Sequence, residues 1–511
     1  MSNQCISIVV KNDDSILLVN DGYSNSWDIP RIEIDDIGCV EPLIIKQLTK
    51  LELDCDCLKI EYLLQKVYTY NCRDSVINVC QDVCNSEIMH YAFVYDISPN
   101  KNICADKCKW ASIEDIFNCK QINYFDSLIP AFTAAEKIIR ANIGIDKTLE
   151  GITQFYENLG FSVQTINFTN NSINGLISES NKKYFFKIGS IQDIYQEIRG
   201  YFTIKNEYPV PPIYEIILLN EDIILIYYYE ESISTDSGTL SDYINDCTQN
   251  NYQLSSEQIN NILCIYKHNL HHTKISNAAP IDLFYRERKD TRIIPWYLKN
   301  DEFLRILKYN TSINGKAAEV PYDIINDCNC YFSEDRNLTC FLCQGDPNEL
   351  NIGMKPIFFD FQTSGYNPIA AEFAILFWSL YLAGGYFYPK YHEAAYRMHK
   401  NIVKNVCLHK PDIKYSIDHI QKQIRIELNY KPNYARGQVL KNYLEVFRQD
   451  SLLDELNKNL KYHLIYRVIG TLNILQMEET DMVMSLAFML IFNHDSSNYM
   501  DYLLSIIDKG V

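Results

Sequence analysis

The sequence predicts an α+β protein in which a mixed N-terminal domain is followed by a strand-rich segment and then by a long helical segment. Strand and helix patterns are mixed over residues 1–231, whereas helical periodicity dominates from residue 236 onward. A length of 511 residues allows about three domains. Apolar residues make up 47 % and charged residues 22 % of the chain, which is typical of a globular protein with full cores.

Charge and hydropathy exclude several classes of function. The net charge of −18 repels phosphate backbones, so we expect no nucleic-acid partner. The first apolar run, Ile6 to Val10, is too short for the core of a signal peptide. The longest apolar run, Ala370–Tyr388, contains Glu372 and favours a buried helix over a membrane span. We therefore expect a cytoplasmic protein without a membrane partner, and the sequence leaves its oligomeric state open.

The first segment begins with a β-hairpin pattern. Over residues 5–20, apolar runs flank a turn at Asn12-Asp13-Asp14. The further expected elements are a helix at 43–53, strands at 60–70 and 87–96, and a helix that begins at Trp110–Ile116 with Ser112 as its N-cap. Together they make residues 1–125 a mixed α and β domain.

Helices and then strands follow this first domain. Two helices are expected at Ala134–Ile143 and Lys147–Asn158, and Gly160 ends the second. The expected strands are Phe161–Phe168, Gly175–Glu179, Tyr184–Ile188, Ile213–Leu219 and Ile223–Tyr229, with a helix at Ile191–Asn206 between them. We accordingly divide the chain into an N-terminal domain (1–125), a helical linker (126–144), a strand-rich segment (145–235) and a helical segment (236–511).

Two acids and an amide follow predicted strands in the helical segment. Asp346 and Asn351 lie in the loop after the strand Leu338–Cys343, and the apolar strand Ile357–Phe359 leads into Asp360. This set suits a Mg²⁺–nucleotide site, because Mg²⁺ prefers oxygen ligands, usually one or two carboxylates with phosphate oxygens and water. A free carboxylate beside the ion can orient a hydroxyl and accept its proton.

A matching set lies upstream in the strand-rich segment. Lys187 ends the strand that begins at Tyr184, and Glu197 follows on a helix. A strand lysine held by a helix glutamate grips nucleotide phosphates in kinases. The preceding stretch, residues 168–177, contains Asn174 and is expected to form a turn over the phosphates. Residues 227–231 fall where a hinge between two lobes would lie.

Residues 145–511 resemble the aminoglycoside phosphotransferase and choline kinase superfamily, which has a two-lobed protein-kinase-like fold with a β-rich N-lobe and a helical C-lobe. The family's His-Gly-Asp loop, with an Asn five residues after the Asp, is matched by Gln344-Gly345-Asp346 and Asn351. Its Ile-Asp-Phe-type strand end is matched by Phe359-Asp360-Phe361. The sequence departs from the family at Gln344, in a nucleotide loop with Gly175 as its one glycine, and at Glu372 in place of an Asp.

The resemblance implies an ATP- and Mg²⁺-dependent phosphotransferase that uses an alcohol group as acceptor. The implied roles are Asp346 as base, Asn351 and Asp360 as Mg²⁺ ligands, Lys187 and Asn174 as ATP contacts, and Glu197 as the ion-pair partner of Lys187. The acceptor would be a small molecule such as a cationic amino sugar or a choline-like alcohol, which agrees with the negative net charge.

The N-terminal segment resembles a Nudix domain, an α/β/α fold. The resemblance rests on the hairpin Ile6–Val19, the turn Trp27–Pro30 and the helix at 43–53. In that family the helix carries glutamates that hold a divalent metal for diphosphate hydrolysis. Here the helix core Lys46–Leu51 has no carboxylate, and Arg31-Ile32 replaces a glycine pair. We therefore expect a Nudix-like fold without Nudix hydrolysis, in a structural or ligand-sensing role.

Three competing functions stay open at this point. A nucleotide-binding pseudokinase or scaffold is favoured by Gln344 and the glycine-poor loop. An active Nudix hydrolase is disfavoured by the missing glutamates. A protein kinase is disfavoured because only about ten residues separate Asp360 from the next predicted helix, which leaves little platform for a peptide.

Cysteine and histidine clusters offer a further alternative. The 17 cysteines include the spaced pairs Cys80/Cys84 and Cys104/Cys108 and a group at Cys328–Cys343. Zinc binding is one interpretation, but small buried thiols are expected because a predicted strand points Cys340 and Cys343 to opposite faces. The histidines at 268, 271 and 272 are expected to pack, with a pocket role left open.

Overall fold

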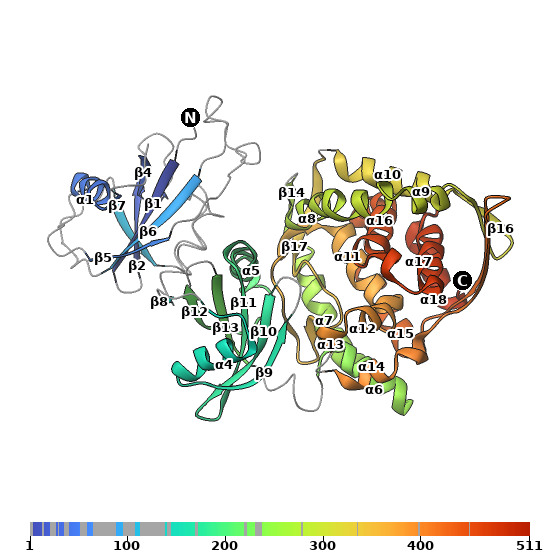
Figure 1. The fold of residues 1–511 in the computed structure, drawn as a ribbon, viewed down its shortest axis with the longest axis horizontal. Helices are drawn as coiled ribbons and strands as arrows, with labels where there is room; N and C mark the ends of the chain where they lie inside the picture. The colour runs from blue at the N-terminus through green and yellow to red at the C-terminus, as the bar shows by residue number, and fades with distance from the viewer. Residues whose placement is uncertain are drawn as a thin grey trace. The chain divides into compact units, whose positions relative to one another are not determined.

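Figure 1 shows the computed structural model of the chain. It describes residues 145–511 except 169–171, 219–221, 230–237, 277–278, 335, 397–398 and 449. Within residues 1–144 it describes 4–12, 15–20, 27–28, 30–34, 40–51, 59–64, 88–95, 108–112 and 138–140. The chain divides into two compact units, Met1–Gly144 with Tyr214–Leu225, and Ile145–Ile213 with Ile226–Val511. The predicted mixture of helices and sheets is confirmed.

The first unit contains a sheet of seven described strands. Its main path is β3-β2-β1-β6-β5, while β4 pairs with β1 and β7 with β2. The bounds are β1 (Gln4–Asn12), β2 (Ser15–Asn20), β3 (Trp27–Asp28), β4 (Arg31–Ile34), β5 (Lys59–Leu64), β6 (Ile88–Tyr95) and β7 (Cys108–Ser112), with helix α1 (Val40–Lys50). Strands β1 and β2 pair antiparallel, as the hairpin pattern predicts, and β1 also pairs parallel with β6.

Two predicted helices are wrong where the structure describes them. Residues 110–112 belong to strand β7, which pairs antiparallel with β2 so that Trp110 lies opposite Leu17. Ile138–Arg140 form strand β8, which pairs parallel with β12 (Ile213–Leu218), so the helical linker is wrong at these residues. In both cases pairing with a distant strand overrides the local helical pattern. Residues 113–137 lie outside the described part of the chain.

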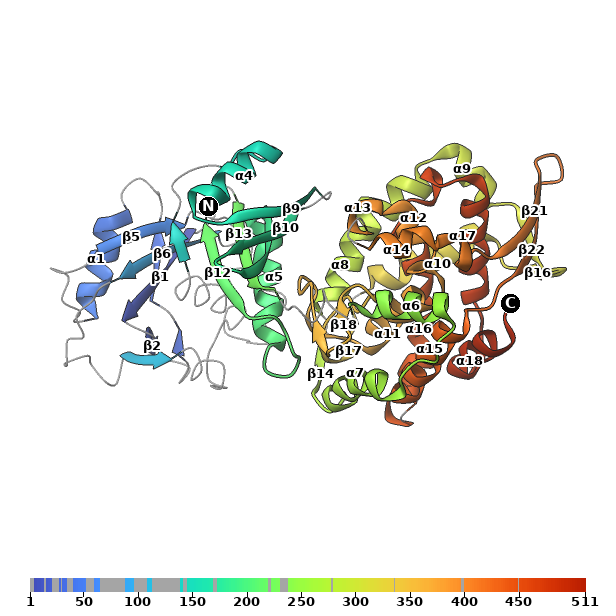
Figure 2. The same ribbon diagram turned by 90° about the horizontal axis from the view of Figure 1, so that it is seen from below.

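The next part of the chain, residues 149–228, forms two helices and the strands of a mixed parallel and antiparallel sheet. The bounds are α4 (Leu149–Asn158), β9 (Ser162–Phe168), β10 (Ser172–Glu179), β11 (Lys182–Ser190), α5 (Ile191–Ile204) and β13 (Asp222–Tyr228). Among the described residues, the strand order of this sheet is β8-β12-β13-β11-β10-β9, and α5 packs against β11 (Figure 2). The N-cap Thr148 starts α4, and Gly160 follows it with a φ of +87°. The helix predicted at Lys147–Asn158 and its end at Gly160 are therefore confirmed.

The turn predicted at residues 168–177 is wrong for the residues that the structure describes. Phe168 ends β9, and residues 172–177 belong to β10, so Asn174 lies in a strand directly opposite Lys187. The connecting residues 169–171 lie outside the described part. Apolar residues at alternating positions of β10 are buried, which explains why this stretch continues the sheet.

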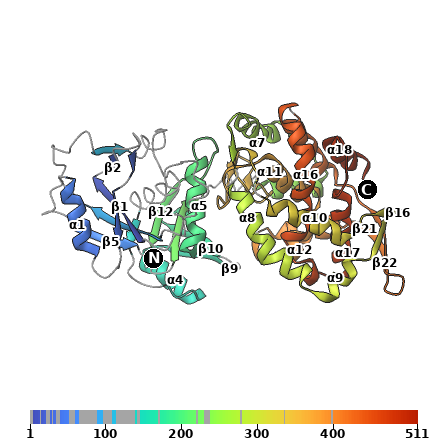
Figure 3. The same cartoon turned by 90° about the horizontal axis from the view of Figure 1, so that it is seen from above.

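From residue 240 the second unit is mainly helical (Figure 3). The α-helices are α6 (Leu240–Asn250), α7 (Ser256–Asn269), α8 (Pro280–Arg288), α9 (Asp301–Leu307), α10 (Pro321–Ser333), α11 (Ile369–Trp378), α12 (Phe387–Tyr391), α13 (Glu393–Tyr396), α14 (Lys400–Lys404), α15 (Tyr434–Phe447), α16 (Asp450–Gly470), α17 (Glu479–Phe492) and α18 (Tyr499–Lys509). Two π-helical segments, η4 (Lys289–Leu298) and η5 (Ser379–Ala383), continue α8 and α11, and the 3₁₀ segments are η6 (Val406–His409) and η7 (Ile474–Gln476).

The helical core forms around α11. Every residue of α11 and η5 is buried, and α11 packs against α16, which in turn packs against α17. The apolar run Ala370–Tyr388 is therefore interior helix, as its glutamate suggests. Among the described residues, no helix is both long and apolar enough to cross a membrane.

Short strands connect these helices. They are β14 (Thr273–Ser276), β15 (Asn310–Ile313), β16 (Lys316–Ala318), β17 (Leu338–Cys343), β18 (Ile352–Gly353), β19 (Ile357–Phe358), β20 (Gly365–Pro368), β21 (Asp412–Asp418) and β22 (Gln423–Asn429). The sheets are β14-β17-β20, β18-β19 and β16-β15-β22-β21. The buried strand β17 leads into residues 344–351, and the pair β18-β19 leads into Asp360. These two strand ends position the site.

Candidate functional site

Lys187 joins two carboxylates that lie far apart in the sequence. Its Nζ lies 2.6 Å from Glu197 Oε2 and 3.0 Å from Asp360 Oδ1. The other oxygen of Glu197 accepts from the Tyr227 hydroxyl and from the Phe361 amide, each at 3.2 Å. Glu197 is buried, whereas the side chain of Asp360 is 42 % exposed. The lysine and the glutamate are thus fixed, and the aspartate faces a region that a ligand can reach.

The charges of this group support one another. Burial alone would lower the pKa of Lys187, but the carboxylates of Asp360 and Glu197 outweigh burial and raise it. Burial acts to raise the pKa of Asp360, and the Lys187 ammonium outweighs burial and lowers it. Asp360 also has a φ of +59°, which is uncommon for a residue other than glycine. A charged carboxylate is therefore held in a costly backbone conformation beside a charged lysine.

Gln344 links the loop after β17 to the backbone of Phe359 and Asp360 by hydrogen bonds. Its buried side-chain amide donates to the carbonyls of Phe359 at 2.6 Å and Asp360 at 2.8 Å. Its Oε1 accepts from the amide of Asp346 at 2.8 Å. The neutral amide of Gln344 thus makes three hydrogen bonds that fix the loop.

Asp346 is held in place by its neighbours. Its Oδ2 accepts from Asn348 Nδ2 at 3.1 Å, and its backbone carbonyl accepts from Asn351 Nδ2 at 2.9 Å. Arg467 Nη2 lies 3.5 Å from Asp346 Oδ1. Burial raises the pKa of Asp346 and the charge of Asp360 adds to this effect, while Arg467 opposes it. A positioned carboxyl group with a raised pKa has the properties of a general base.

The predicted site residues form two contact networks, and Asn174 lies beside the first of them. Lys187, Glu197 and Asp360 form one contact network, and Asp346 and Asn351 form another, with Gln344 bonded to both. Asn174 lies beside the first group, since it is the cross-strand partner of Lys187. Its Oδ1 accepts from Asn167 Nδ2 at 3.5 Å.

Gly345 and Glu372 bring the loop close to its support. Gly345 has a φ of +92°, and a Cβ there would lie 2.1 Å from the Thr363 carbonyl oxygen, so a side chain does not fit. The Gly345 amide donates to Glu372 Oε2 at 3.0 Å. Burial raises the pKa of Glu372 from its ordinary value of 4.5 to about 8. Glu372 is therefore a protonated, hydrogen-bonding support at pH 7.

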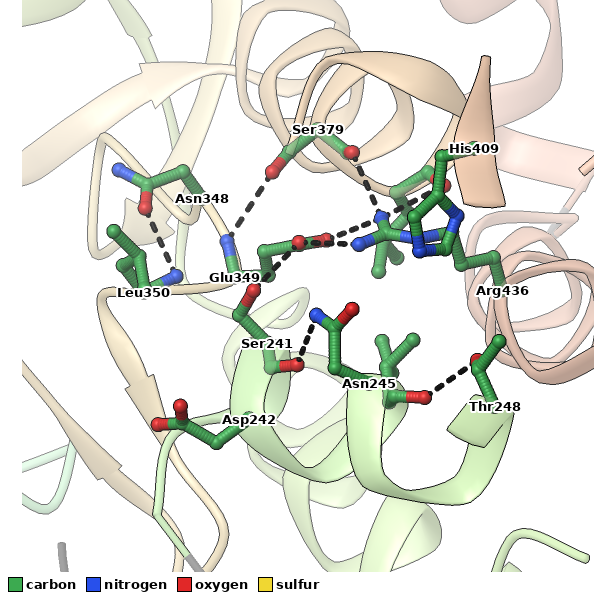
Figure 4. Close-up of polar contacts among 12 residues, drawn as sticks. Ser241, Asp242, Asn245, Thr248, Asn348, Glu349, Leu350, Ser379, His409 and Arg436 are labelled. Atoms are coloured by element: carbon green, nitrogen blue, oxygen red, sulfur yellow. Dashed lines mark hydrogen bonds and ion pairs between the residues drawn. The ribbon is translucent and has the colours of Figure 1, made fainter. Parts of the chain in front are cut away.

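A buried ion pair anchors the other end of the loop (Figure 4). Both guanidinium nitrogens Nη1 and Nη2 of Arg436 donate to Glu349 at 2.7 Å, and both side chains are fully buried. Ser241 Oγ also donates to Glu349, and the Glu349 amide donates to Ser379 Oγ. A Cβ at Gly384 would lie 2.4 Å from Glu349 Oε1, so this glycine makes room for the pair.

Sequence reasoning missed Glu349 and Arg436. Glu349 could have been found from its place between Asp346 and Asn351, because an acid inside a functional loop needs a partner. Arg436 lies 87 residues after Glu349 in the sequence, and no local sequence pattern indicates that the two side chains pair.

The histidine and cysteine clusters also have defined surroundings. His268 Nε2 and His272 Nε2 lie 3.5 and 3.9 Å from Glu207 Oε2, and His268 is 67 % exposed, so the packing expected for it is wrong. Among the described residues, these three make the one group of His, Cys, Asp and Glu that could share a metal. Cys340 and Cys343 are buried thiols, as expected, and Cys80, Cys84 and Cys104 lie outside the described part.

We expect Glu349→Gln to lower the free energy of unfolding by about 3–5 kcal/mol, because it leaves the Arg436 charge buried without its partner. Urea unfolding checks this value. Glu445→Gln, which removes a partner of the exposed Arg448, is the matched control and should change stability by less than about 1 kcal/mol. Equal effects of the two substitutions would contradict a buried, uncompensated charge at Arg436.

We also expect the stability of Glu372→Gln relative to the wild type to depend on pH. A folded-state pKa raised to about 8 gives stability that is complete below pH 4.5 and is lost progressively up to pH 8. The neutral glutamine has no such loss, so the variant should gain ~1.4 kcal/mol on the wild type per pH unit between pH 5 and 8. Urea unfolding at pH 5.5, 6.5 and 7.5 measures the gain, with the exposed Glu287→Gln as control. A difference that does not change with pH would show that Glu372 is ionised in the folded protein.

Comparison with known proteins finds solved structures at low similarity. No protein-family model and no curated protein matches the chain. An apo thermostable mutant of aminoglycoside phosphotransferase APH(4)-Ia is 9 % identical, with 70 % of this chain and 99 % of that chain covered and a TM-score of 0.35. Another thermostable mutant of that enzyme, solved as a ternary complex with ADP and hygromycin B, gives the same identity and coverage and a TM-score of 0.32. A NUDIX-family hydrolase from Clostridium perfringens is 15 % identical, covering 26 % of this chain and 97 % of its own, with a TM-score of 0.19. Because these TM-scores are low, the function has to be inferred from the residues of the site.

Proposed function

We propose that residues 145–511 are an ATP-dependent small-molecule kinase, which transfers the γ-phosphoryl group to a hydroxyl of its acceptor. The observation that carries the proposal is the contact of Lys187 with both Glu197 and Asp360, beside a loop that holds Asp346. In kinases a strand lysine paired with a helix glutamate binds nucleotide phosphates, and a metal-binding aspartate lies next to it. Asn174, opposite Lys187, is proposed as a further nucleotide contact.

The donor set fits a magnesium ion. Asp360 offers a half-exposed carboxylate. Asn351 uses its amide nitrogen to bond the Asp346 carbonyl, so its Oδ1 is the atom that a cation would take. Both are hard oxygen ligands of the kind that Mg²⁺ prefers. When bound, Mg²⁺ would neutralise charge on the phosphate oxygens.

The remaining steps belong to the chain's own residues. Lys187 binds the phosphates and is held in position by Glu197. Asp346 orients the acceptor hydroxyl and takes its proton as the new phosphorus–oxygen bond forms and the bond to ADP breaks. Gln344 and Glu372 position the loop, so that the Asp346 carboxylate does not have to be ordered during the reaction.

The domain bounds proposed from the sequence complete this assignment. Residues 145–235 form the N-lobe and 236–511 the C-lobe of a kinase-like fold, after a Nudix-like domain at 1–125 and a linker at 126–144. We propose that the N-terminal domain has a structural or ligand-sensing role. A Nudix hydrolase, the second candidate, is disfavoured because Glu41 is the one acidic residue of helix α1.

We expect the wild-type protein to bind ATP in the presence of Mg²⁺, and Asp360→Asn to weaken this binding about tenfold or more, because it removes a charged ligand. Isothermal calorimetry measures both. Asp495→Asn removes the same charge at an exposed surface site and should leave the affinity unchanged. Absence of Mg²⁺-dependent ATP binding in the wild type would overturn the kinase proposal.

The base assignment has its own test. Wild-type protein supplied with ATP and a panel of hydroxyl compounds should release ADP with the correct acceptor, and Asp346→Asn should lose about 10²-fold or more of that rate while still binding ATP. If ATP binds and no acceptor in a panel of neutral, cationic and anionic alcohols is phosphorylated, the pseudokinase alternative gains support.

A further inference from the structure

Arginines gather around Asp346 on the side of the helices. Arg467, on α16, places Nη2 3.5 Å from Asp346 Oδ1 and 3.4 Å from the Tyr388 hydroxyl. Its side chain is 6 % exposed, and its Nε is buried without a hydrogen-bond partner. The guanidinium of Arg467 is thus almost fully removed from water, and the ion pair that it forms with Asp346 is a long one.

Arg288, at the end of α8, adds a second cation. Its Nε is also buried without a hydrogen-bond partner, and its guanidinium stacks on the Phe284 ring at 3.8 Å. Burial and the charges of Arg292 and Arg467 lower the pKa of Arg288 to about 9, and Asp346 opposes this shift. Helix α8 runs into η4, η4 packs against α16, and the Tyr466 hydroxyl on α16 donates to the Tyr285 carbonyl on α8. Arg288, Arg292 and Arg467 therefore lie on adjoining segments.

Arg292, Tyr285 and His392 are further polar residues near Arg288 and Arg467. Arg292, on η4, is held by the carbonyls of Gly470 and Thr471 at the end of α16. The buried hydroxyl of Tyr285 has no hydrogen-bond partner. Burial, followed by the charges of Arg292 and Arg288, lowers the pKa of His392. Asp346 acts on Arg288 and the exposed Glu287 acts on Arg292, and the exposed Asp290 lies between the two arginines in sequence.

A structural role accounts for only part of this arrangement. One arginine is enough to balance Asp346, and a second guanidinium whose Nε is buried without a hydrogen-bond partner costs free energy unless an anion pairs with it. Planar guanidinium groups bind carboxylate and phosphate through paired N–H donors. The cluster contacts Asp346 through Arg467, whereas the proposed nucleotide contacts Lys187 and Asp360 are linked to the Asp346 loop through Gln344.

We propose that the acceptor site beside Asp346 takes an anionic substrate, a hydroxyl compound that carries a phosphate or carboxylate group bound by Arg288, Arg467 and Arg292. This inference rests on the proposed kinase function for the identity of the reaction, and it replaces the cationic acceptor expected from the family resemblance. The γ-phosphoryl group would pass to the hydroxyl, its proton to Asp346, and ADP would leave.

The test uses the wild-type chain and the reaction of arginine with phenylglyoxal, followed by peptide mass spectrometry. We expect inorganic phosphate and D-glycerate to slow the modification of Arg288 about fivefold or more, and choline to leave it unchanged. The exposed Arg448 is the internal control and should react at the same rate throughout. An Arg288 that does not react, or that no anion protects, would overturn the proposal. Equal protection by Mg²⁺ and a non-hydrolysable ATP analogue alone would assign the arginines to the nucleotide and would also overturn it.

Matched variants give an independent measurement. With the ATP analogue and Mg²⁺ present, calorimetry should show phosphate binding that Arg288→Gln weakens about tenfold or more, and that Arg448→Gln, which removes the same charge at the surface, leaves within about twofold. Equal phosphate affinity of the two variants would contradict the proposed site. If the wild type binds Mg²⁺–ATP but does not bind phosphate, this inference alone is overturned. Protection of Arg288 by phosphate in a protein that does not bind Mg²⁺–ATP would overturn the kinase proposal alone.

Discussion

The ion contacts of Lys187 are the interaction on which the site depends. The lysine sits on β11, one carboxylate comes from α5 and the other from the residue after the β18-β19 pair, 173 residues further along the chain. Burying the charges of Lys187 and Glu197 is costly unless each has a partner, and here the ammonium serves both carboxylates while Tyr227 and Phe361 satisfy Glu197. The strand-rich and helical parts of the second unit are thereby joined at the point where the proposed nucleotide binds.

The loop that carries Asp346 is fixed from three directions by buried groups. Gln344 bonds it to the backbone at Asp360, Glu372 accepts from the Gly345 amide, and the Glu349–Arg436 pair holds its far end. Each support is polar and buried, so each is satisfied only in one arrangement of the loop. A catalytic group on a loop gains its precision from such packing, because the loop has no ladder of backbone hydrogen bonds of its own.

The charges on the two sides of Asp346 differ. Toward Lys187 the site presents Asp360 and Glu197 against one lysine, a net negative arrangement suited to a metal ion with its phosphates. On α16 and α8 it meets cations, because Arg467 lies 3.5 Å from Asp346 Oδ1 and the charge of Asp346 acts on Arg288. The net charge of the whole chain, −18, gives no hint of this local reversal, because binding is decided by the groups within a few ångströms of the ligand.

Local sequence patterns were enough to predict the mixed α and β class, the hairpin of β1 and β2 and the strands β9 to β13, because alternation and helical periodicity record burial directly. Motif spacing and a family resemblance singled out the candidate site residues Lys187, Glu197, Asp346, Asn351 and Asp360, whose roles are proposals. Tertiary structure alone decided that residues 110–112 and 138–140 are strands, because their partners are β2 and β12 rather than their neighbours in sequence. It alone also paired Glu349 with Arg436 and gathered Arg288 and Arg467 at Asp346. Charged side chains show no periodicity, and their meaning depends on the partner that folding places beside them.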